Sequence, residues 1–340
     1  MPIVEFTKEG LYVPIADVYI DPWRRVRKAF ITHGHSDHSR WGHQQYLCTH
    51  ASRPILRHRL GNVNVGSIDF GEEVMVNGVK FSFHPAGHIV GSAQIRVEHK
   101  GEVWVVSGDY KVENDGISGA FEPVKCHAFI TECTFGLPIY TWLPQQEVFQ
   151  QINQWWSENK ANNLTTILTG YSLGKAQRLL AGLDISIGPI YTHGAVEQLT
   201  EVIRQGGVSL PTTIHINDSV KTADLMGGIV VAPPGATGGN WMKRFKQVSI
   251  GSASGWMQLR GARRRGGADR GFVLSDHADW EGLNQTIADT GAERIFATHG
   301  YTDVFRRWLE SQGYDAKVVK TQFEGERAEA TELPKEEGQE

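Results

Sequence analysis

Four side chains that can bind a metal ion lie within six residues of this chain: His33, His35, Asp37 and His38. They follow directly on the apolar segment 29–31, which has the composition of a short strand. Imidazole nitrogens and carboxylate oxygens suit zinc and its first-row neighbours. Closed structural zinc sites usually contain cysteine, and no cysteine lies among these four residues. The segment therefore predicts an open, catalytic metal site at the end of a strand.

Length and composition are those of an ordinary globular protein. The chain has 340 residues, 40% of them hydrophobic, which is enough for one large or two modest domains. Its N-terminus lacks the pattern of a signal peptide, and no apolar run is long enough to span a bilayer. We therefore expect a cytoplasmic protein without a membrane partner. The spacing of Cys48, Cys126 and Cys133 favours neither a disulfide framework nor a CxxC zinc site, so we expect reduced, structural cysteines.

Charge is unevenly distributed along the chain. The net charge is -4, but residues 324–340 hold seven acidic side chains against Arg327 and Lys335, which leaves +1 for residues 1–323. We expect this acidic tail to be disordered. A basic cluster that could contact a phosphate backbone precedes it, with an exposed loop kept soluble by charge as the alternative. The cluster consists of Arg260, Arg263, Arg264, Arg265 and Arg270.

Short apolar segments, several of them alternating, predict strands in the first part of the chain at 18–20, 29–31, 79–83, 93–97 and 103–106. Loops that carry histidine or aspartate follow these segments. The polar chemistry is therefore expected at strand ends, as in a layered α/β fold.

The pattern becomes helical from residue 145, where Val148, Ile152, Trp155 and Trp156 recur at helical spacing. We interpret the tryptophans as helix core and not as a platform for nucleobases. A strand at 165–169 and a helix at 173–183 then predict a βα unit. Strands followed by histidine return at 271–274 and 295–298, so the first domain is expected to resume after an insertion.

A site with two metal ions needs about three protein ligands for each ion and a group that bridges them. The residues at the strand ends meet this requirement: His33, His35 and His88 for one ion, Asp37, His38 and His299 for the other, and Asp109 as the bridge. His84 is the nearest rival to His88. Two such ions could activate a shared water and clamp the attacking and leaving oxygens, which suits phosphodiester hydrolysis.

The HxHxDH run, together with Asp21, His88 and Asp109, resembles the motifs of the metallo-β-lactamase fold. The 190 positions between Asp109 and His299, and the counterparts of three further motifs at Glu132, His277 and His299, narrow the resemblance to the β-CASP nucleases. This resemblance implies an α/β fold, with a metallo-β-lactamase αββα sandwich formed by residues 1–137 and 269–323. An inserted α/β β-CASP domain would occupy residues 138–268. The acidic tail would consist of residues 324–340.

Three longer strings resemble the bacterial DNA-ligase-associated exonuclease group: residues 19–24, 106–113 and 272–280. The resemblance implies a metal-dependent DNA exonuclease in repair, with an ATP-dependent DNA ligase and a helicase as partners. Zinc is the expected metal and manganese the alternative. By analogy with the eukaryotic repair branch, we expect digestion from 5′ to 3′. Cys133 departs from the group, because its relatives commonly carry serine there.

The resemblance also suggests roles for single residues. A hydroxide that bridges the metals would attack phosphorus, with Asp37 counted among the catalytic residues. His277 would donate a proton to the leaving oxygen, and Glu132 would orient His277. Asp21 is expected to fix the tautomer of a histidine ligand. DNA phosphates are assigned to Lys175, Arg178, Ser252 and Ser254, with an ordinary solvated helix face as the alternative for the first two.

Three rival functions remain. An RNA-directed β-CASP ribonuclease is favoured by His299, because eukaryotic DNA-directed relatives often lack a histidine at that position. A small-molecule hydrolase of the same fold is disfavoured by the insertion and by Glu132 and His277. A catalytically inactive DNA-binding or scaffold subunit would be expected to have lost ligands, whereas all seven are present.

Overall fold

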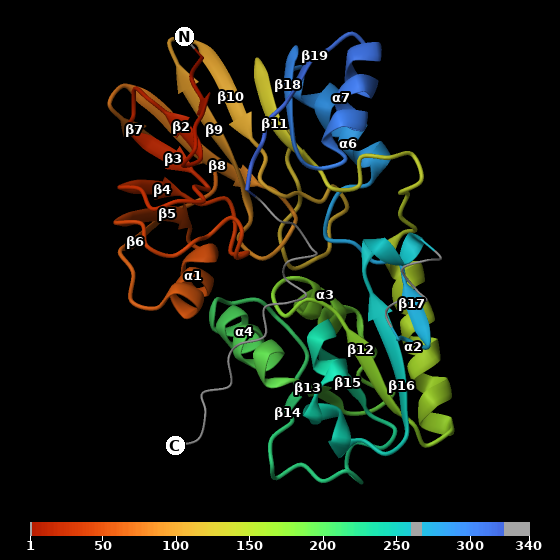
Figure 1. Ribbon diagram of the computed structural model, residues 1–340. Coiled ribbons are helices and arrows are strands. Elements are labelled where there is room, and N and C mark those ends of the chain that lie inside the picture. The colour runs from red at the N-terminus through yellow and green to blue at the C-terminus, as the bar shows by residue number, and fades with distance from the viewer. Residues whose placement is uncertain (1, 260–266, 323–340) are drawn as a thin grey trace. The chain divides into compact units, whose positions relative to one another are not determined.

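The computed structural model describes residues 2–259 and 267–322, which form a mixed α/β structure with three sheets (Figure 1). The described residues fall into two compact units. Unit 1 combines Met1–Thr141 with Asp276–Gly325, and unit 2 is built on Trp142–Ser275. Arg260, Arg263, Arg264, Arg265 and the acidic tail lie outside the described residues. The named domains and their predicted boundaries stay predictions.

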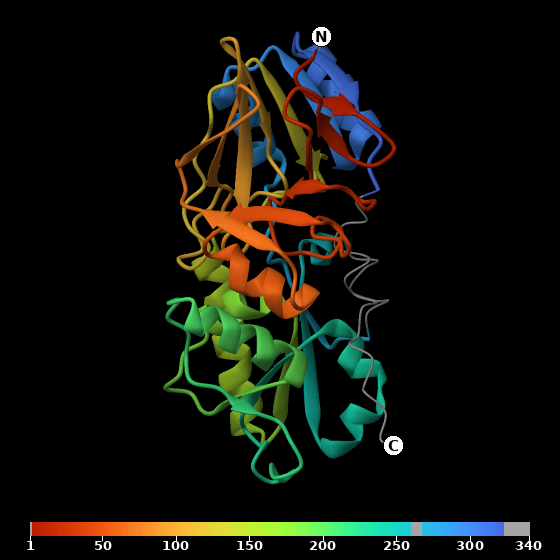
Figure 2. The ribbon, with the colours of Figure 1, turned by 90° about the vertical axis from the view of Figure 1, so that its left-hand side faces the viewer.

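The first sheet of unit 1 has the strand order β1-β2-β3-β4-β5-β6. Its strands are β1 (Glu5–Phe6), β2 (Leu11–Val13), β3 (Val18–Ile20), β4 (Lys28–Phe30), β5 (Gln45–Thr49) and β6 (Val65–Ile68). Strands β3 to β6 are parallel. Helix α1 (Ser52–Leu60) packs on this sheet, where Leu56 shares a core cluster with Ala29 and Tyr46 (Figure 2). The parallel arrangement places the residues that follow β3 and β4 at the same edge of the sheet.

The second sheet of unit 1 has the order β19-β18-β11-β10-β9-β8-β7. Its strands are β7 (Glu73–Val76), β8 (Val79–Pro85), β9 (Ala93–His99), β10 (Glu102–Val106), β11 (Ala128–Cys133), β18 (Arg294–Gly300) and β19 (Asp315–Val318). Helices α6 (Trp280–Thr290) and α7 (Thr302–Ser311) share a core cluster with this sheet. Strands β10, β11 and β18 are parallel neighbours, so their carboxyl ends meet at one edge.

The two sheets of unit 1 share a hydrophobic core. Ile20 and Phe30 of the first sheet lie in one buried cluster with Phe81, Phe83 and other side chains of the second. The rings of Phe30 and Phe81 meet edge to face, with their centroids 4.9 Å apart. Because Phe30 is the last residue of β4, this contact fixes the strand end from which the candidate metal ligands emerge.

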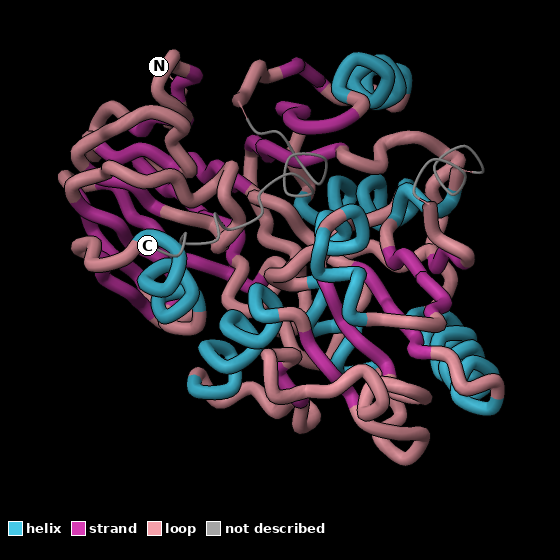
Figure 3. The backbone as a smooth tube through the Cα atoms, turned by 60° about the horizontal axis from the view of Figure 1, so that its bottom comes forward, coloured by secondary structure: helices cyan, strands magenta, loops and turns pink. Residues whose placement is uncertain are grey.

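Unit 2 contains one parallel sheet of order β14-β13-β15-β12-β16-β17, accompanied by helices (Figure 3). The strands are β12 (Thr165–Thr169), β13 (Ile190–Thr192), β14 (Ile214–His215), β15 (Ile229–Ala232), β16 (Val248–Ala253) and β17 (Arg270–Phe272). The helices are α2 (Gln145–Ala161), α3 (Lys175–Gly182) and α4 (Gly194–Gln205), with short 3-10 turns η1 (Pro234–Gly238), η2 (Asn240–Arg244) and η3 (Gly255–Gln258). Trp155 and Trp156 belong to the core of this unit, which confirms their interpretation as helix core.

Most strands and helices expected from the pattern are confirmed, with small shifts at their ends. Strands 18–20 and 165–169 and the helix start at residue 145 are as predicted. The helix expected at 173–183 begins only at Lys175, because Gly174 adopts the left-handed φ of 87° at its N-cap. The strand expected at 271–274 is β17, which ends at Phe272.

The three cysteines are buried and free, which confirms the expectation of unpaired, structural thiols. Burial raises the pKa of Cys48 and of Cys126 to about 12, so both stay protonated at neutral pH. No helix among the described residues is both long and apolar enough to cross a membrane.

We expect Phe81→Ala to destabilise unit 1 by about 3–5 kcal/mol, because the ring is fully buried between the two sheets. Met75→Ala, on the neighbouring strand β7, is the matched control, since Met75 is 63% exposed and should change stability by less than about 0.5 kcal/mol. Urea denaturation followed by circular dichroism measures both. Equal effects of the two substitutions would contradict the shared core.

Candidate metal centre

Hydrogen bonds within the chain hold the loop that carries His33 to His38. The backbone N–H and the Oγ of Ser39 both donate to the carbonyl of His35, each at 2.8 Å. From α1, the guanidinium of Arg59 donates to the carbonyl of Gly34 and, at 2.7 Å, to Ser39 Oγ. The loop that presents the candidate ligands is therefore fixed by its own sequence and by α1.

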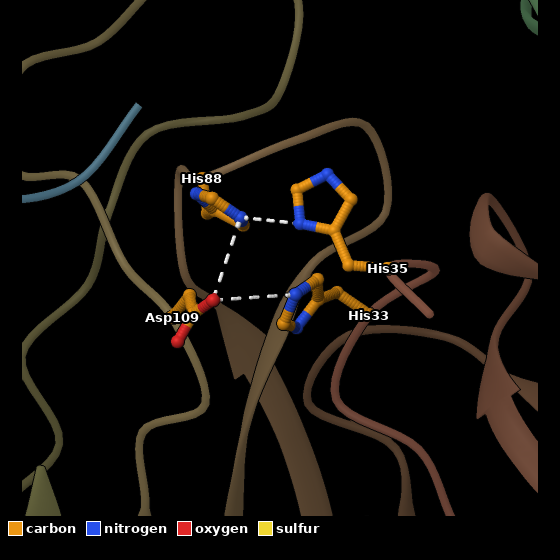
Figure 4. A group of neighbouring side chains, drawn as sticks. All are labelled: His33, His35, His88 and Asp109. Atoms are coloured by element: carbon orange, nitrogen blue, oxygen red, sulfur yellow. Dashed lines mark hydrogen bonds and ion pairs between the residues drawn. The ribbon is translucent and has the colours of Figure 1, made fainter. Parts of the chain in front are cut away.

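The first candidate ligand group consists of His33, His35, His88 and Asp109 (Figure 4). His88 Nε2 lies 3.0 Å from His35 Nδ1, and Asp109 Oδ2 lies 3.6 Å from His33 Nε2 and 3.8 Å from His88 Nε2. One possible ligand atom from each residue lies within 4.8 Å of the others, and all four residues are buried. Their nitrogens and one oxygen thus converge on a common point.

The second candidate group consists of Asp37, His38 and His299. His38 Nε2 lies 3.7 Å from Asp37 Oδ2 and 3.5 Å from Asp109 Oδ2. The other oxygen of Asp109, Oδ1, lies 3.5 Å from His299 Nδ1. The carboxylate of Asp109 therefore lies between the two groups and contacts residues of both.

The distances from Asp109 to the surrounding imidazoles fit metal ions better than hydrogen bonds, whereas His35 and His88 are close enough to form one. Separations of 3.5–3.8 Å are long for a hydrogen bond. Two ligands that bind one tetrahedral zinc at about 2.0–2.1 Å lie roughly 3.3 Å apart. His33 Nε2 and Asp109 Oδ1 are also buried and make no hydrogen bond with any described residue. Buried polar atoms of this kind need a partner, and a divalent cation would provide one.

Electrostatics at the first group favour a bound cation. For Asp109, burial opposes the charged form, but His38 and His299 outweigh it and hold its pKa well below the usual value. Burial, reinforced by His38, lowers the pKa of His33 well below its usual value, and burial also lowers the pKa of His88. Asp109 is therefore ionised and these two histidines are neutral at neutral pH, the forms that bind metal.

Asp21 orients His38 from behind. Its Oδ2 lies 2.8 Å from His38 Nδ1, so the other ring nitrogen faces the ligand group. Thr32, which the sequence did not single out, donates to Asp21 twice, from its backbone N–H at 2.8 Å and from Oγ1 at 2.5 Å. Gly108 is required beside this pair: its φ is +58°, and a Cβ there would lie 2.7 Å from Thr32 Oγ1.

A backbone carbonyl orients His88. The Nδ1–H of His88 donates to the carbonyl of Asp276 at 2.8 Å, so Nε2 is the nitrogen that faces His35 and Asp109 in the ligand group. The rival residue His84 lies apart from this arrangement, and its Nε2 is 2.9 Å from Ser82 Oγ. The structure thus brings His88, and not His84, into the candidate group.

Glu132 and His277 form a buried pair beside the first group. His277 Nδ1 lies 2.9 Å from both carboxylate oxygens of Glu132. Tyr110 N–H donates to Glu132 Oε1 at 2.9 Å, and Thr134 Oγ1 donates to Oε2 at 2.6 Å. The ring of His277 is 4.6 Å from that of His88 between centroids. Glu132 thus fixes the ring of His277 from the side of Nδ1, and Asp109, Glu132 and His277 form a further group of buried side chains that could hold a metal.

The two basic residues of unit 2 that were predicted to contact phosphate are not exposed. Lys175 and Arg178 are buried, so the alternative of a solvated helix face is wrong. The guanidinium of Arg178 donates to Gln145 Oε1 from Nε at 3.1 Å and from Nη2 at 2.9 Å, and also to the carbonyl of Ser275. Ser254 accepts a hydrogen bond from the N–H of Trp256 at 3.2 Å. Phosphate binding by Lys175, Arg178, Ser252 and Ser254 stays a prediction.

Comparison with known proteins finds relatives among nucleases and ligases, whereas no family model matches. The chain is 31% identical over 314 residues to a protein named probable DNA ligase from Opitutus terrae, covering 91% of this chain and 30% of that protein. It is 26% identical over 195 residues to an RNase J-like protein from Methanocaldococcus jannaschii, covering 53% of this chain and 45% of the relative. It is also 33% identical over 122 residues to the endoribonuclease YSH1 of Yarrowia lipolytica, covering 35% and 14%. The chain thus spans less than half the length of each of these three relatives.

The fold also occurs among solved structures. A crystal structure of a protein of unknown function from Enterococcus faecalis V583 superposes with a TM-score of 0.63 at 12% identity. The match covers 87% of this chain and 80% of the other. At this identity the likeness concerns the fold alone.

We expect His88→Ala to reduce divalent-metal affinity at least about 10-fold, because it removes a nitrogen of the first group. His84→Ala is the matched control, since His84 lies four residues away and outside the group, and it should bind metal as the unaltered protein does. Isothermal titration with zinc and elemental analysis of the dialysed protein measure both. Loss of metal in the His84 variant alone would refute the assignment.

Proposed function

We propose that this protein is a metal-dependent nuclease of the β-CASP type that hydrolyses phosphodiester bonds. The observation that carries the proposal is the position of Asp109, whose carboxylate contacts both buried ligand groups. The similarities to an RNase J-like protein, an endoribonuclease and a probable DNA ligase support the same class. Unit 1 would be the metallo-β-lactamase αββα sandwich and unit 2 the inserted β-CASP domain.

Seven residues would hold two divalent ions, zinc in our proposal: His33, His35, Asp37, His38, His88, Asp109 and His299. When bound, such ions lower the pKa of water and stabilise negative charge on a phosphate. The buried carboxylate of Asp109, which contacts both ligand groups, would contribute to holding both ions. Asp21 and the carbonyl of Asp276 would keep the imidazoles of His38 and His88 in the ligand orientation.

His277 would supply the proton for the leaving oxygen. Its Nδ1 faces Glu132, so a proton to be transferred resides on Nε2. A buried carboxylate at 2.9 Å stabilises the imidazolium and fixes the ring, as the aspartate does for histidine in a catalytic triad. Tyr110 and Thr134 hold Glu132 in turn, so the orientation of His277 does not depend on substrate.

DNA is the substrate that we propose, with a DNA ligase as functional partner. A similarity that covers 91% of this chain is to a probable DNA ligase. Exonuclease action from 5′ to 3′ in DNA repair and association with a helicase follow only from the sequence resemblance and belong to the same proposal. An RNA-directed nuclease is the second candidate, because the RNase J-like and YSH1 relatives carry ribonuclease names.

The test is incubation of zinc- or manganese-loaded protein with end-labelled single- and double-stranded DNA and RNA of matched sequence. We expect a ladder of products from DNA ends. Preferential cleavage of RNA would favour the second candidate. Internal cuts in closed circular DNA would contradict the exonuclease, and no cleavage of any substrate would contradict the nuclease.

His277→Ala should lower kcat about 10²- to 10⁴-fold while metal content persists, because the proton donor is lost and the ligands remain. His215→Ala is the control, since His215 is an exposed histidine of β14 in unit 2. Steady-state rates and elemental analysis of the same samples measure the effect. Retained turnover in the His277 variant would rule out its role as proton donor.

A further inference from the structure

An exposed tryptophan lies just beyond the candidate ligands. Trp41 is 63% exposed, and the guanidinium carbon of Arg25 lies 4.8 Å from the centroid of its ring. It lies three positions after His38, so the two Cα atoms are at most about 11 Å apart. Trp41 therefore presents a large aromatic face to solvent close to the candidate metal centre.

Gly42, the residue after Trp41, leaves room for Arg25 to lie against the indole ring. Gly42 has a φ of +105°, and a Cβ at this position would lie 2.8 Å from Arg25 Nε and 3.0 Å from Arg25 Cγ. Any other residue would both strain the backbone and push the arginine aside. Glycine next to Trp41 is thus what allows the guanidinium to lie over the indole.

Two loops are tied together to make this arrangement. The N–H of Val26 donates to His43 Nδ1 at 3.2 Å, and the N–H of Gln44 donates to the carbonyl of Val26 at 3.1 Å. Tyr46 OH donates to the carbonyl of Arg40 at 3.0 Å. Arg25 and Trp41 each lie next to a residue of this network. The pair is therefore held by backbone contacts on both sides.

His43 stays neutral in this position, because burial lowers its pKa to about 4. A neutral imidazole can accept the hydrogen bond from Val26, whereas an imidazolium cannot. The tie between the loops is thus intact at every pH above about 5.

Arginines lie beside Trp41 and on the helix that holds the ligand loop. Arg24 and Arg25 are exposed and form no ion pair with any described residue. Helix α1 carries Arg53, Arg57 and Arg59 and no acidic residue, and Arg59 contacts the ligand loop directly. Positive charge of this kind attracts a phosphate backbone.

We propose that Trp41, backed by Arg25, is a stacking platform for an unpaired nucleobase of the substrate strand. This inference rests on the proposed nuclease function and adds to it a preference for single-stranded ends. A base in a duplex already has both faces stacked, whereas an unpaired base can place one face on the indole. The neighbouring arginines would hold the phosphates of the same strand.

The test compares Trp41→Ala with Trp41→Phe and Trp308→Phe in steady-state cleavage of (dT)15, with (rU)15 in a parallel arm. Loss of one base–aromatic stack should raise KM about 5- to 150-fold in Trp41→Ala, with kcat within about twofold. Trp41→Phe keeps an aromatic face and should remain within about threefold of the unaltered protein. A blunt duplex should be cut with little change by all variants.

Tryptophan fluorescence supplies a readout that does not depend on turnover. With metal removed by EDTA, (dT)15 should quench the emission of the unaltered protein and of Trp308→Phe, which lacks a part-exposed tryptophan on α7. Trp41→Phe should lose that component of the quenching. Circular dichroism should show all variants folded, because Trp41 is exposed.

Failure of the platform and failure of the nuclease proposal are distinguishable. If the unaltered protein cleaves (dT)15 and Trp41→Ala has the same KM, the platform is refuted while the nuclease stands. If Trp41→Ala abolishes self-association of the protein and leaves KM for (dT)15 unchanged, Trp41 belongs to a protein interface, and the platform is likewise refuted. If the unaltered protein neither binds nor cleaves any polynucleotide, both proposals fall.

Discussion

The carboxylate of Asp109 is the point on which the rest of unit 1 depends. It is buried among imidazoles, with His33 and His38 near one oxygen and His299 near the other. A buried carboxylate is stable only when charge or hydrogen bonds compensate for the water it loses. Here the histidines compensate in part, and divalent ions would complete the compensation. Burial of the Asp109 carboxylate costs free energy in the absence of a cation, and it therefore favours binding of a cation.

Sheet geometry explains why residues so far apart in sequence meet at Asp109. Strands β10, β11 and β18 are parallel neighbours, and Asp109, Glu132 and His299 lie at their carboxyl ends. The core shared by the two sheets brings the end of β4, with His33, to the same region. The contacts of Asp21, Thr32 and the Asp276 carbonyl then set the direction of each ring. Strand order thus sets the positions of the candidate ligands, and these hydrogen bonds set the orientations of their side chains.

Sequence spacing predicted which residues the structure brings together in the two candidate groups, because metal chemistry restricts residue type and spacing so strongly. Contacts made through the backbone were not, since any residue offers a carbonyl such as that of Asp276. The burial of Arg178 was also hidden, because its partner Gln145 lies on another helix, 33 positions earlier. Trp41 escaped notice because a single exposed aromatic has no periodic signal. The tryptophans that do recur at helical spacing, Trp155 and Trp156, were predicted to be helix core and pack there.

Anomalous diffraction from crystals of zinc-loaded protein tests the central claim most directly. The account predicts two peaks about 3.5–4 Å apart. One should be bound by His33, His35 and His88, the other by Asp37, His38 and His299, with one oxygen or both of Asp109 between them. A single peak, or peaks away from Asp109, would contradict it.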